Sequence, residues 1–240
     1  LIATLESAKK HPHYAAPLTQ NQGRGISCGF WFNFGGDTCV SLNINFDGTV
    51  GIIEGNPDIG GSRASISQMA AEELGIPLEK ISTVIADTNS LGHNDVTDGS
   101  RVTFAVGLAT IKAAKAAKKE MCKRVAKLWK IHEDAVIWKD GYVLPAGPNA
   151  GDQEPLALKE IAAMSAQTGG PIAGHHEVNA EGAGVSFGVH LVDVEVDPET
   201  GQTKILRYTV FQDAGKAVHP SYVEGQMQGG SVQGIGWALN

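Results

Sequence analysis

Three glycine-rich turns, each followed by a predicted helix, are the segments of this sequence best suited to bind a ligand. They cover residues 58–62, 97–101 and 213–215, and the last leads through Pro220 into the segment 225–231. Glycine lets a backbone approach a ligand closely, and a helix N-terminus offers unpaired N–H groups and partial positive charge. The turns could therefore cradle phosphates and together suit an elongated anionic cofactor. The alternative for any single turn is close helix packing without a ligand.

The turn at Gly99, Ser100 and Arg101 has the most specific chemistry of the three. Arginine supplies a forked donor and serine a hydroxyl where a helix should begin. The sequence contains neither a G-x-x-x-x-G-K-[ST] loop nor a strand-borne G-x-G-x-x-G. The common nucleotide-binding folds are therefore not indicated.

The last predicted helix is unusually rich in glycine. Within residues 225–236 these are Gly225, Gly229, Gly230, Gly234 and Gly236. Each should cost a helix up to about 1 kcal/mol relative to alanine. Either another backbone packs against this face, or a ligand lies along it with Gln226, Gln228 and Gln233 as donors. The residues alone leave both interpretations open.

Two G-x-S-x-G matches, at residues 25–29 and 184–188, would nominate a serine hydrolase with a histidine as base. Neither lies between a predicted strand and helix, which that mechanism requires. His175-His176-Glu177 resembles a metal motif, but neighbouring residues of a strand point to opposite faces, so a polar strand end is the preferred interpretation.

The three cysteines, Cys28, Cys39 and Cys122, are too far apart for a zinc or iron–sulfur motif and are expected to be reduced, buried thiols. The lysines of residues 112–130 lack interleaved aromatics and are interpreted as the solvated face of a long helix. A net charge of −7 gives no global basic field, so we expect no nucleic-acid partner. No apolar run approaches the ~20 residues of a membrane span.

The 240 residues include 30 glycines, whereas average usage of about 7% would give roughly 17. Apolar and polar periodicity predicts hairpins within 38–54 and 135–143 and an antiparallel pair over 185–211. It predicts helices over 65–74, 104–128 and 156–165, a strand over 81–86 and a helix at the end of the chain. This order predicts an α+β fold of two lobes, with mixed, mostly antiparallel sheets and packed helices.

The expected division is a leading segment of residues 1–23, a first α+β lobe of 24–145 and a second of 146–240. The glycine- and proline-rich stretch 139–152 marks the boundary, although it could equally be a surface loop within one core. Residues 1–14 lack the basic and apolar blocks of a signal peptide, so we expect a cytoplasmic protein.

Several motifs together resemble the molybdopterin-binding subunit of the xanthine dehydrogenase and aldehyde oxidase family. In the second half of the chain these are the strand 190–197, Thr200-Gly201, 213–215, His219-Pro220, Gly225-Gln226 and 233–236. In the first half they are 47–50, 58–65, 68–77, Asp87-Thr88 and 98–101. They follow the family's order and approximate spacing, so the resemblance covers residues 24–240.

The resemblance implies a molybdenum hydroxylase, in which a pterin dithiolene holds the metal and water supplies the oxygen added to an aldehyde or aromatic heterocycle. It implies molybdopterin, in bacterial relatives often as the cytosine dinucleotide. It also implies iron–sulfur clusters and FAD on partner chains or domains. Carried over by motif, the candidate cofactor contacts are Gly60, Gly61, Gly99, Ser100, Arg101, Gln226, Gly229, Gly230 and Ser231. No residue here is expected to ligate the metal itself.

The sequence departs from the family pattern in two places. Gly61 stands where the family usually has a glutamine, and the sequence stops at Asn240, before the motif whose glutamate is the family's general base. We therefore expect a fragment or part of a split subunit that is inactive alone and assembles with the remaining segments and with iron–sulfur and flavin subunits. The alternatives are a cofactor-free binding or assembly domain of the same fold and, more weakly, the serine hydrolase.

Overall fold

The computed structural model describes residues 1–87 and 89–240; Thr88, part of the Asp87-Thr88 motif, lies outside the described residues. The contacts divide the chain into two units, Leu1–Phe32 with Ala183–Asn240, and Asn33–Gly182. The first unit thus joins the two ends of the sequence, a pairing that local patterns do not reveal. The boundary expected near residue 145 lies inside the second unit, between two strands that pair with each other.

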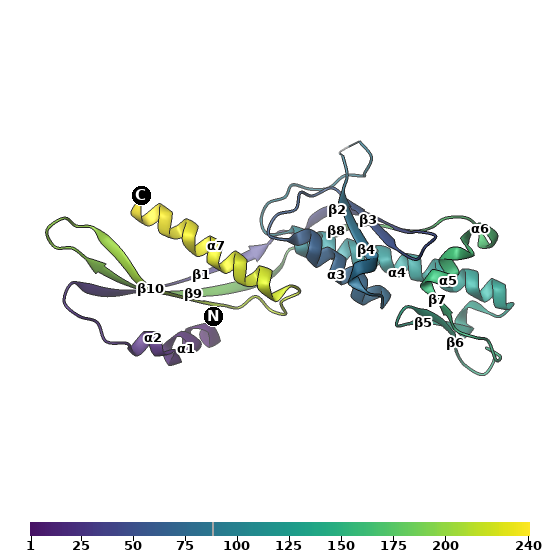
Figure 1. The fold of residues 1–240 in the computed structure, drawn as a ribbon, viewed down its shortest axis with the longest axis horizontal. Coiled ribbons are helices and arrows are strands. Elements are labelled where there is room, and N and C mark those ends of the chain that lie inside the picture. Colours follow the sequence, from purple (N-terminus) through teal and green to yellow (C-terminus); the bar gives the residue numbers. More distant parts are fainter. Residues whose placement is uncertain (88) are drawn as a thin grey trace. The chain divides into compact units, whose positions relative to one another are not determined.

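The second unit is built on a four-stranded sheet in the order β4-β3-β2-β8 (Figure 1). Its strands are β2 (Gly36–Ile44), β3 (Val50–Glu54), β4 (Ile81–Ile85) and β8 (Ile172–Ala180). β2 and β3 form the hairpin expected around Asp47-Gly48, and Gly48 has the positive φ of 82° that such a turn requires. β4 runs parallel to β3, because the intervening helix returns the chain to the same end of the sheet.

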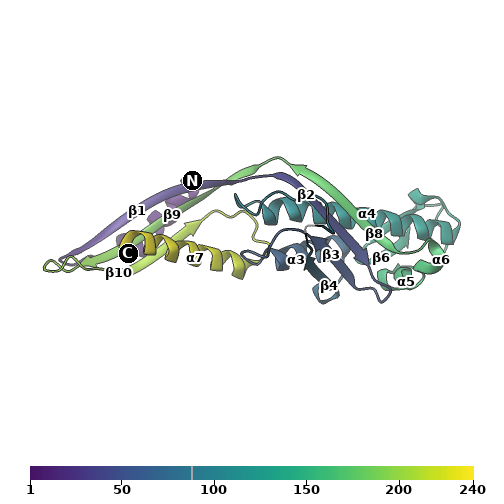
Figure 2. The same cartoon turned by 90° about the horizontal axis from the view of Figure 1, so that it is seen from above.

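Two helices, α3 (Ser62–Leu74) and α4 (Val102–Trp129), pack against this sheet (Figure 2). The buried residues Val40, Leu42 and Ile52 of the strands contribute to one core with Ile66 of α3. On α4 the core face consists largely of alanines, which allow a close approach. α4 confirms the predicted long helix, and α3 begins three residues before the predicted start.

A smaller sheet completes the second unit. It contains β5 (Val136–Lys139), β6 (Tyr142–Pro145) and β7 (Leu156–Ala157). The 135–143 hairpin is confirmed. The helix predicted over 156–165 is shorter, because its first two residues pair as β7 and only α5 (Leu158–Ala163) follows, before the single turn α6 (Ser165–Thr168). Short 3₁₀ turns occupy Leu78–Lys80 and Glu133–Ala135.

The first unit contains a three-stranded sheet in the order β1-β9-β10. Its elements are α1 (Ile2–Lys10), α2 (Pro12–Ala15), β1 (Gln22–Asn33, which extends one residue into the second unit), β9 (Ala183–Val196), β10 (Thr203–Gln212) and α7 (Pro220–Leu239). β9 and β10 are the predicted antiparallel pair, and α7 is the predicted final helix, which contacts β10.

The α+β class with mostly antiparallel sheets is confirmed. Among the described helices, none is long and apolar enough to cross a membrane. The expectation of three buried thiols is wrong for Cys28, which is exposed on β1, whereas Cys39 is buried and Cys122 is half-buried. All three thiols are free.

Candidate functional site

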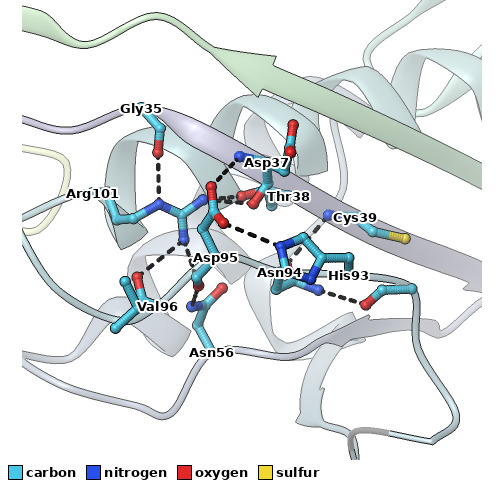
Figure 3. Close-up of polar contacts among 11 residues, drawn as sticks. Gly35, Asp37, Thr38, Cys39, Asn56, His93, Asn94, Asp95, Val96 and Arg101 are labelled. Atoms are coloured by element: carbon cyan, nitrogen blue, oxygen red, sulfur yellow. Dashed lines mark hydrogen bonds and ion pairs between the residues drawn. The ribbon is translucent and has the colours of Figure 1, made fainter.

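Arg101, at the start of α4, is the centre of a buried polar network (Figure 3). The residue is only 2% exposed, and all five guanidinium N–H groups have acceptors within the protein. The acceptors are Gly35 O at 2.6 Å, Asp37 O at 2.8 Å, Asp95 O at 3.0 Å, Val96 O at 3.5 Å and Thr38 Oγ1. The guanidinium therefore joins the start of β2 to the loop of residues 93–98.

This placement differs from the role expected from the sequence, in which the fork of Arg101 faces a phosphate. No N–H donor of the guanidinium is left for a ligand. Burial lowers the pKa of Arg101, and the neighbouring Asp95 and Asp37 oppose that shift. We interpret Arg101 as a positioning residue that fixes the loop before the Gly99-Ser100 turn.

Other residues hold the same loop to the sheet. Asp95 pairs with Asp37 twice: Asp37 N donates to Asp95 Oδ2 at 2.6 Å, and Asp95 N donates to Asp37 O at 2.9 Å. Asn56, which is buried after β3, donates from Nδ2 to Asp95 O at 3.0 Å and to Thr97 Oγ1 at 2.9 Å. The loop is thus connected to both β2 and the residues that follow β3.

Gly99 and Ser100 both adopt left-handed backbone conformations, each with φ of 59°. A Cβ added to Gly99 would lie 1.9 Å from Cδ2 of Phe34, whose backbone N–H donates to Gly99 O at 3.0 Å. The glycine is therefore required by packing, which agrees with the interpretation of this turn as close packing without a ligand. The left-handed φ of Ser100 is strained for a residue with a Cβ, and such strain is common at binding sites.

Gly60 and Gly61 form the turn before α3, with φ of 64° and 77°. The carboxylate of Asp58 already lies at this helix N-terminus: Oδ1 accepts from Arg63 N at 3.1 Å, and Oδ2 lies 3.2 Å from Arg63 Nε. Its negative charge opposes the binding of a phosphate at the same N–H groups. The helix begins at Ser62 after the glycine cap, so Ser65, where it was predicted to begin, lies inside its first turn.

The predicted residues of α7 fall on two sides of the helix. Gln226, Gly229 and Gly230 are exposed, and nothing in the described structure lies within 4 Å of a Cβ added to either glycine. Ser231 is buried and lines the groove of about 540 Å³ between α7 and β10, where its hydroxyl donates to Met227 O at 2.7 Å. The exposed glycine side is thus without a packing partner among the described residues.

The site residues predicted from the sequence therefore form separate groups. The turns at Gly60-Gly61 and Gly99-Ser100-Arg101 belong to the second unit, and the α7 residues belong to the first. Within the second unit, Arg101 holds the loop of residues 93–98, which leads into the Gly99-Ser100-Arg101 turn.

Glu54 is a buried titratable residue that is not among the site residues predicted from the sequence. It is 1% exposed at the end of β3, and its Oε2 accepts from Asn56 N at 2.7 Å. Burial raises the pKa of Glu54 to about 7, although that hydrogen bond partly opposes the shift. Strand alternation could have found it, because Glu54 shares its parity with the buried Val50 and Ile52.

Cys39, His175 and Glu177 also lie together, on the paired strands β2 and β8. The adjacent His175 and His176 point to opposite faces of β8, so they cannot share an ion. His175 and Glu177 are two residues apart and share a face, to which pairing with β2 adds Cys39.

The two G-x-S-x-G segments lie within β1 and β9 rather than between a strand and a helix. The hydroxyl of Ser186 donates to Asp213 O at 2.5 Å and accepts from Gln212 Nε2 at 2.6 Å. The nucleophile geometry of a serine hydrolase is therefore not formed at Ser186.

Comparison with known proteins identifies the family of the chain. A family model described as the molybdopterin cofactor-binding domain matches residues 3–240. The nicotine 6-hydroxylase large subunit of Paenarthrobacter nicotinovorans is 29% identical over 206 residues, which are 83% of this chain and 25% of that protein. The putative xanthine dehydrogenase molybdenum-binding subunit of Escherichia coli K12 is 28% identical over 235 residues, which are 91% of this chain and 30% of that protein.

The fold agrees with solved structures. Carbon monoxide dehydrogenase from Oligotropha carboxidovorans, in reconstituted form, matches with a TM-score of 0.74 at 24% identity, over 87% of this chain and 28% of that one. The chain thus spans between a quarter and a third of the length of these three relatives.

Proposed function

Because the chain belongs to the molybdopterin cofactor-binding domain family, we propose that it holds part of a molybdenum cofactor within a larger oxidoreductase. The proposed reaction is hydroxylation of an aldehyde or an aromatic heterocycle, with water as the source of oxygen. Relatives named as a nicotine 6-hydroxylase, a xanthine dehydrogenase and an aldehyde oxidoreductase support that substrate class. When bound, the cofactor would supply the two-electron redox chemistry of this reaction.

The exposed glycine side of α7 is the observation that carries the proposal. Gly229 and Gly230 lower helix propensity, and no described residue packs against the space that their missing side chains leave. A flat or elongated ligand can approach the backbone there, and the amide of Gln226 offers both a donor and an acceptor. These properties suit a pterin or its phosphate, and the backbone of a segment outside this chain is the alternative occupant.

The turns of the second unit would contribute backbone contacts. Gly60, Gly61, Gly99 and Ser100 are proposed to contact the cofactor through their backbone. The N–H of Gly99 already donates to Asp98 Oδ1, and Asp58 already lies at the N-terminus of α3, so the N–H of Ser100 is the donor proposed for an anionic part of the cofactor. The cytosine dinucleotide, which carries a pyrophosphate, is the form proposed. Arg101 contributes by fixing the loop before its turn.

The proposed enzyme passes electrons to iron–sulfur and flavin groups on partner chains or domains. The relatives are named as large, molybdenum-binding or gamma subunits, which supports an assembly of several subunits. No residue of this chain is proposed as the general base, so the small-molecule substrate is expected to be activated by groups from the remaining segments.

The direct test is metal analysis of the complex purified from its native host, together with the fluorescence of released, oxidised pterin. Near-stoichiometric molybdenum and pterin are expected in the parent protein. In the same complex, Gly229→Leu should reduce both strongly, because the side chain would occupy the space proposed for the ligand. Gly25→Leu is the matched control, since Gly25 also has nothing within 4 Å of an added Cβ but lies on β1.

Two outcomes would contradict the proposal. A pure, folded complex without molybdenum or pterin would favour the cofactor-free binding or assembly domain, for which Gly61 in place of glutamine is the motivating feature. Unchanged cofactor content in Gly229→Leu, with content in the parent intact, would contradict only the placement on α7.

A further inference from the structure

A group of metal-ligating side chains lies on the β2–β8 pair, apart from the residues assigned to the cofactor. Cys39 pairs directly with Glu177 across the two strands, and Ser41 pairs with His175. Residues that face each other in an antiparallel pair project to the same side of the sheet. This side is opposite to the one on which Val40 and Leu42 enter the core.

The distances in this group agree with those of a tetrahedral zinc site. Cys39 Sγ lies 3.7 Å from His175 Nε2, and His175 Nε2 lies 3.6 Å from Glu177 Oε1. Zinc bonds of about 2.3 Å to sulfur and about 2.0 Å to nitrogen, at a tetrahedral angle, would separate those two ligand atoms by about 3.5 Å. The corresponding nitrogen-to-oxygen separation is about 3.4 Å. The third pair, Cys39 Sγ and a carboxylate oxygen of Glu177, lies within 4.8 Å, so rotation of the side chains can bring all three ligand atoms onto one ion.

The orientation of the imidazole supports the same conclusion. Its Nδ1 lies 3.0 Å from Ser41 Oγ, which can accept the Nδ1 proton and so leave the lone pair of Nε2 free. This is the arrangement in which protein histidines bind metals, with the second ring nitrogen held by an oxygen. The free nitrogen then lies between the sulfur and the carboxylate.

The accessibility of the three side chains also agrees with a metal site. Cys39 is 2% exposed, and Gly92 packs so closely that a Cβ there would lie 3.0 Å from Sγ. The side chains of His175 and Glu177 are 54% and 76% exposed, so an ion can reach the imidazole and the carboxylate from solvent. Figure 3 shows the Cys39 sulfur directed away from the Arg101 network, which leaves the thiol free of that structural role.

We propose that Cys39, His175 and Glu177 bind a single zinc ion, with water as the fourth ligand. Thiolate, imidazole and carboxylate together are a zinc-type ligand set. Binding forms one metal–sulfur bond and releases the thiol proton to solvent, with no change of oxidation state. The site joins β2 to β8 and is independent of the molybdenum cofactor. Without an ion, His175 and Glu177 would form only an exposed pair of small energetic value.

The test uses the purified full-length subunit, freed of loosely bound metal on a chelating resin and titrated with Co²⁺. Cobalt substitutes for zinc and reports thiolate ligation by a charge-transfer band, and tetrahedral geometry by intense visible bands. The parent should develop both, and Zn²⁺ should abolish them. Cys39→Ser should remove the charge-transfer band. Ser41→Ala should weaken Co²⁺ binding by about tenfold, because it removes only the partner that orients His175.

Matched variants separate ligation from misfolding. His175→Gln and Glu177→Gln change exposed side chains and should leave the fold intact while weakening Co²⁺ binding by more than Ser41→Ala does. Cys122→Ser and His176→Gln, which alter another thiol and the adjacent histidine, should leave the bands unchanged. Absence of the charge-transfer band in the parent, or its persistence in Cys39→Ser, would overturn the proposal, whatever the molybdenum content of the protein.

Discussion

Arg24 on β1 and Asp193 on β9 form a two-point ion pair that joins the two strands. Nε of Arg24 lies 2.7 Å from Asp193 Oδ1, and Nη2 lies 2.9 Å from Oδ2. His13 of α2 adds a third contact, since its Nε2 lies 3.0 Å from Oδ1, and its Nδ1 lies 2.7 Å from Thr209 Oγ1 on β10. One buried carboxylate thus connects α2 and all three strands of the first unit.

Replacing this carboxylate should destabilise the first unit. The hydrogen bond from Arg24, together with the neighbouring imidazole of His13, lowers the pKa of Asp193 to about 2, below its usual 3.8, although burial opposes the shift. Asp193→Asn should lower the free energy of unfolding by about 3 kcal/mol, because it leaves buried donors without a charged partner. Hydrogen exchange of the β9 and β10 amides, followed by mass spectrometry, measures this local stability.

The same pair predicts an acid dependence. Because the folded pKa of Asp193 is depressed, its contribution is present above about pH 4 and is lost as the pH falls toward 2. Glu195→Gln is the control, since Glu195 lies on the same strand but bonds only to the neutral Gln22 among the described residues. Equal protection of the β9 amides from hydrogen exchange in Asp193→Asn and Glu195→Gln would show that the ion pair adds no stability.

Glu54 predicts the opposite pH dependence in the second unit. Its folded pKa of about 7 lies above the usual 4.5, so the folded state prefers the protonated form. The free energy of unfolding should therefore fall by about 3 kcal/mol as the pH rises from 4.5 to 7 and stay lower above that range. Glu54→Gln should remove this fall, measured as hydrogen exchange of the β3 amides across the pH series.

Glu79→Gln serves as the control for that series. Because Glu79 is exposed, its substitution should leave the dependence of the free energy of unfolding on pH unchanged. Other titrating groups contribute equally to the parent and to both variants, so they cancel in the difference. If the free energy of unfolding changed with pH in the same way in the parent and in Glu54→Gln, the carboxylate of Glu54 would have gained compensating partners in solution.

Local patterns were sufficient to predict most helices and hairpins. The stripe of apolar residues along α4 repeats at the helical period, and Asp47-Gly48 and Asp140-Gly141 specify their turns within a few residues. The parallel pairing of β4 with β3 and the joining of β1 to β9 depend on segments far apart in the sequence. No local period encodes such pairings.

The same distinction applies at the site. The acceptors of Arg101 come partly from Gly35 and Asp37, more than 60 residues earlier in the chain, so local sequence could not show that they occupy its guanidinium. Cys39 and His175 are separated by 136 residues, so their proximity is a property of the β2–β8 register alone. The glycines of α7 stand out in the sequence because they lower helix propensity, but the structure is needed to show that no described residue packs against Gly229 and Gly230.

Close packing of β8 on α4 predicts a large effect of one methyl group. A Cβ added to Gly174 would lie 1.9 Å from Ala113 O, a backbone atom that cannot rotate away. Gly174→Ala should therefore destabilise the second unit by about 3 kcal/mol. Gly51→Ala, on β3, places the same methyl group in open space and should be tolerated. Thermal unfolding of the two variants side by side provides the comparison, and equal melting temperatures would contradict the packing argument.

The hydrogen bonds of the Arg101 guanidinium indicate that lysine cannot replace this residue. A lysine ammonium has three donors on a flexible stem, whereas the five N–H groups of Arg101 reach acceptors on both β2 and the 93–98 loop. Arg101→Lys should increase hydrogen exchange at residues 93–100 by at least about tenfold, since one lost hydrogen bond to a charged group is worth about 1.5–3 kcal/mol. The exposed Arg207→Lys should not change it. If Arg101 instead bound a phosphate directly, Arg101→Lys would reduce cofactor content while leaving the exchange of this loop unchanged.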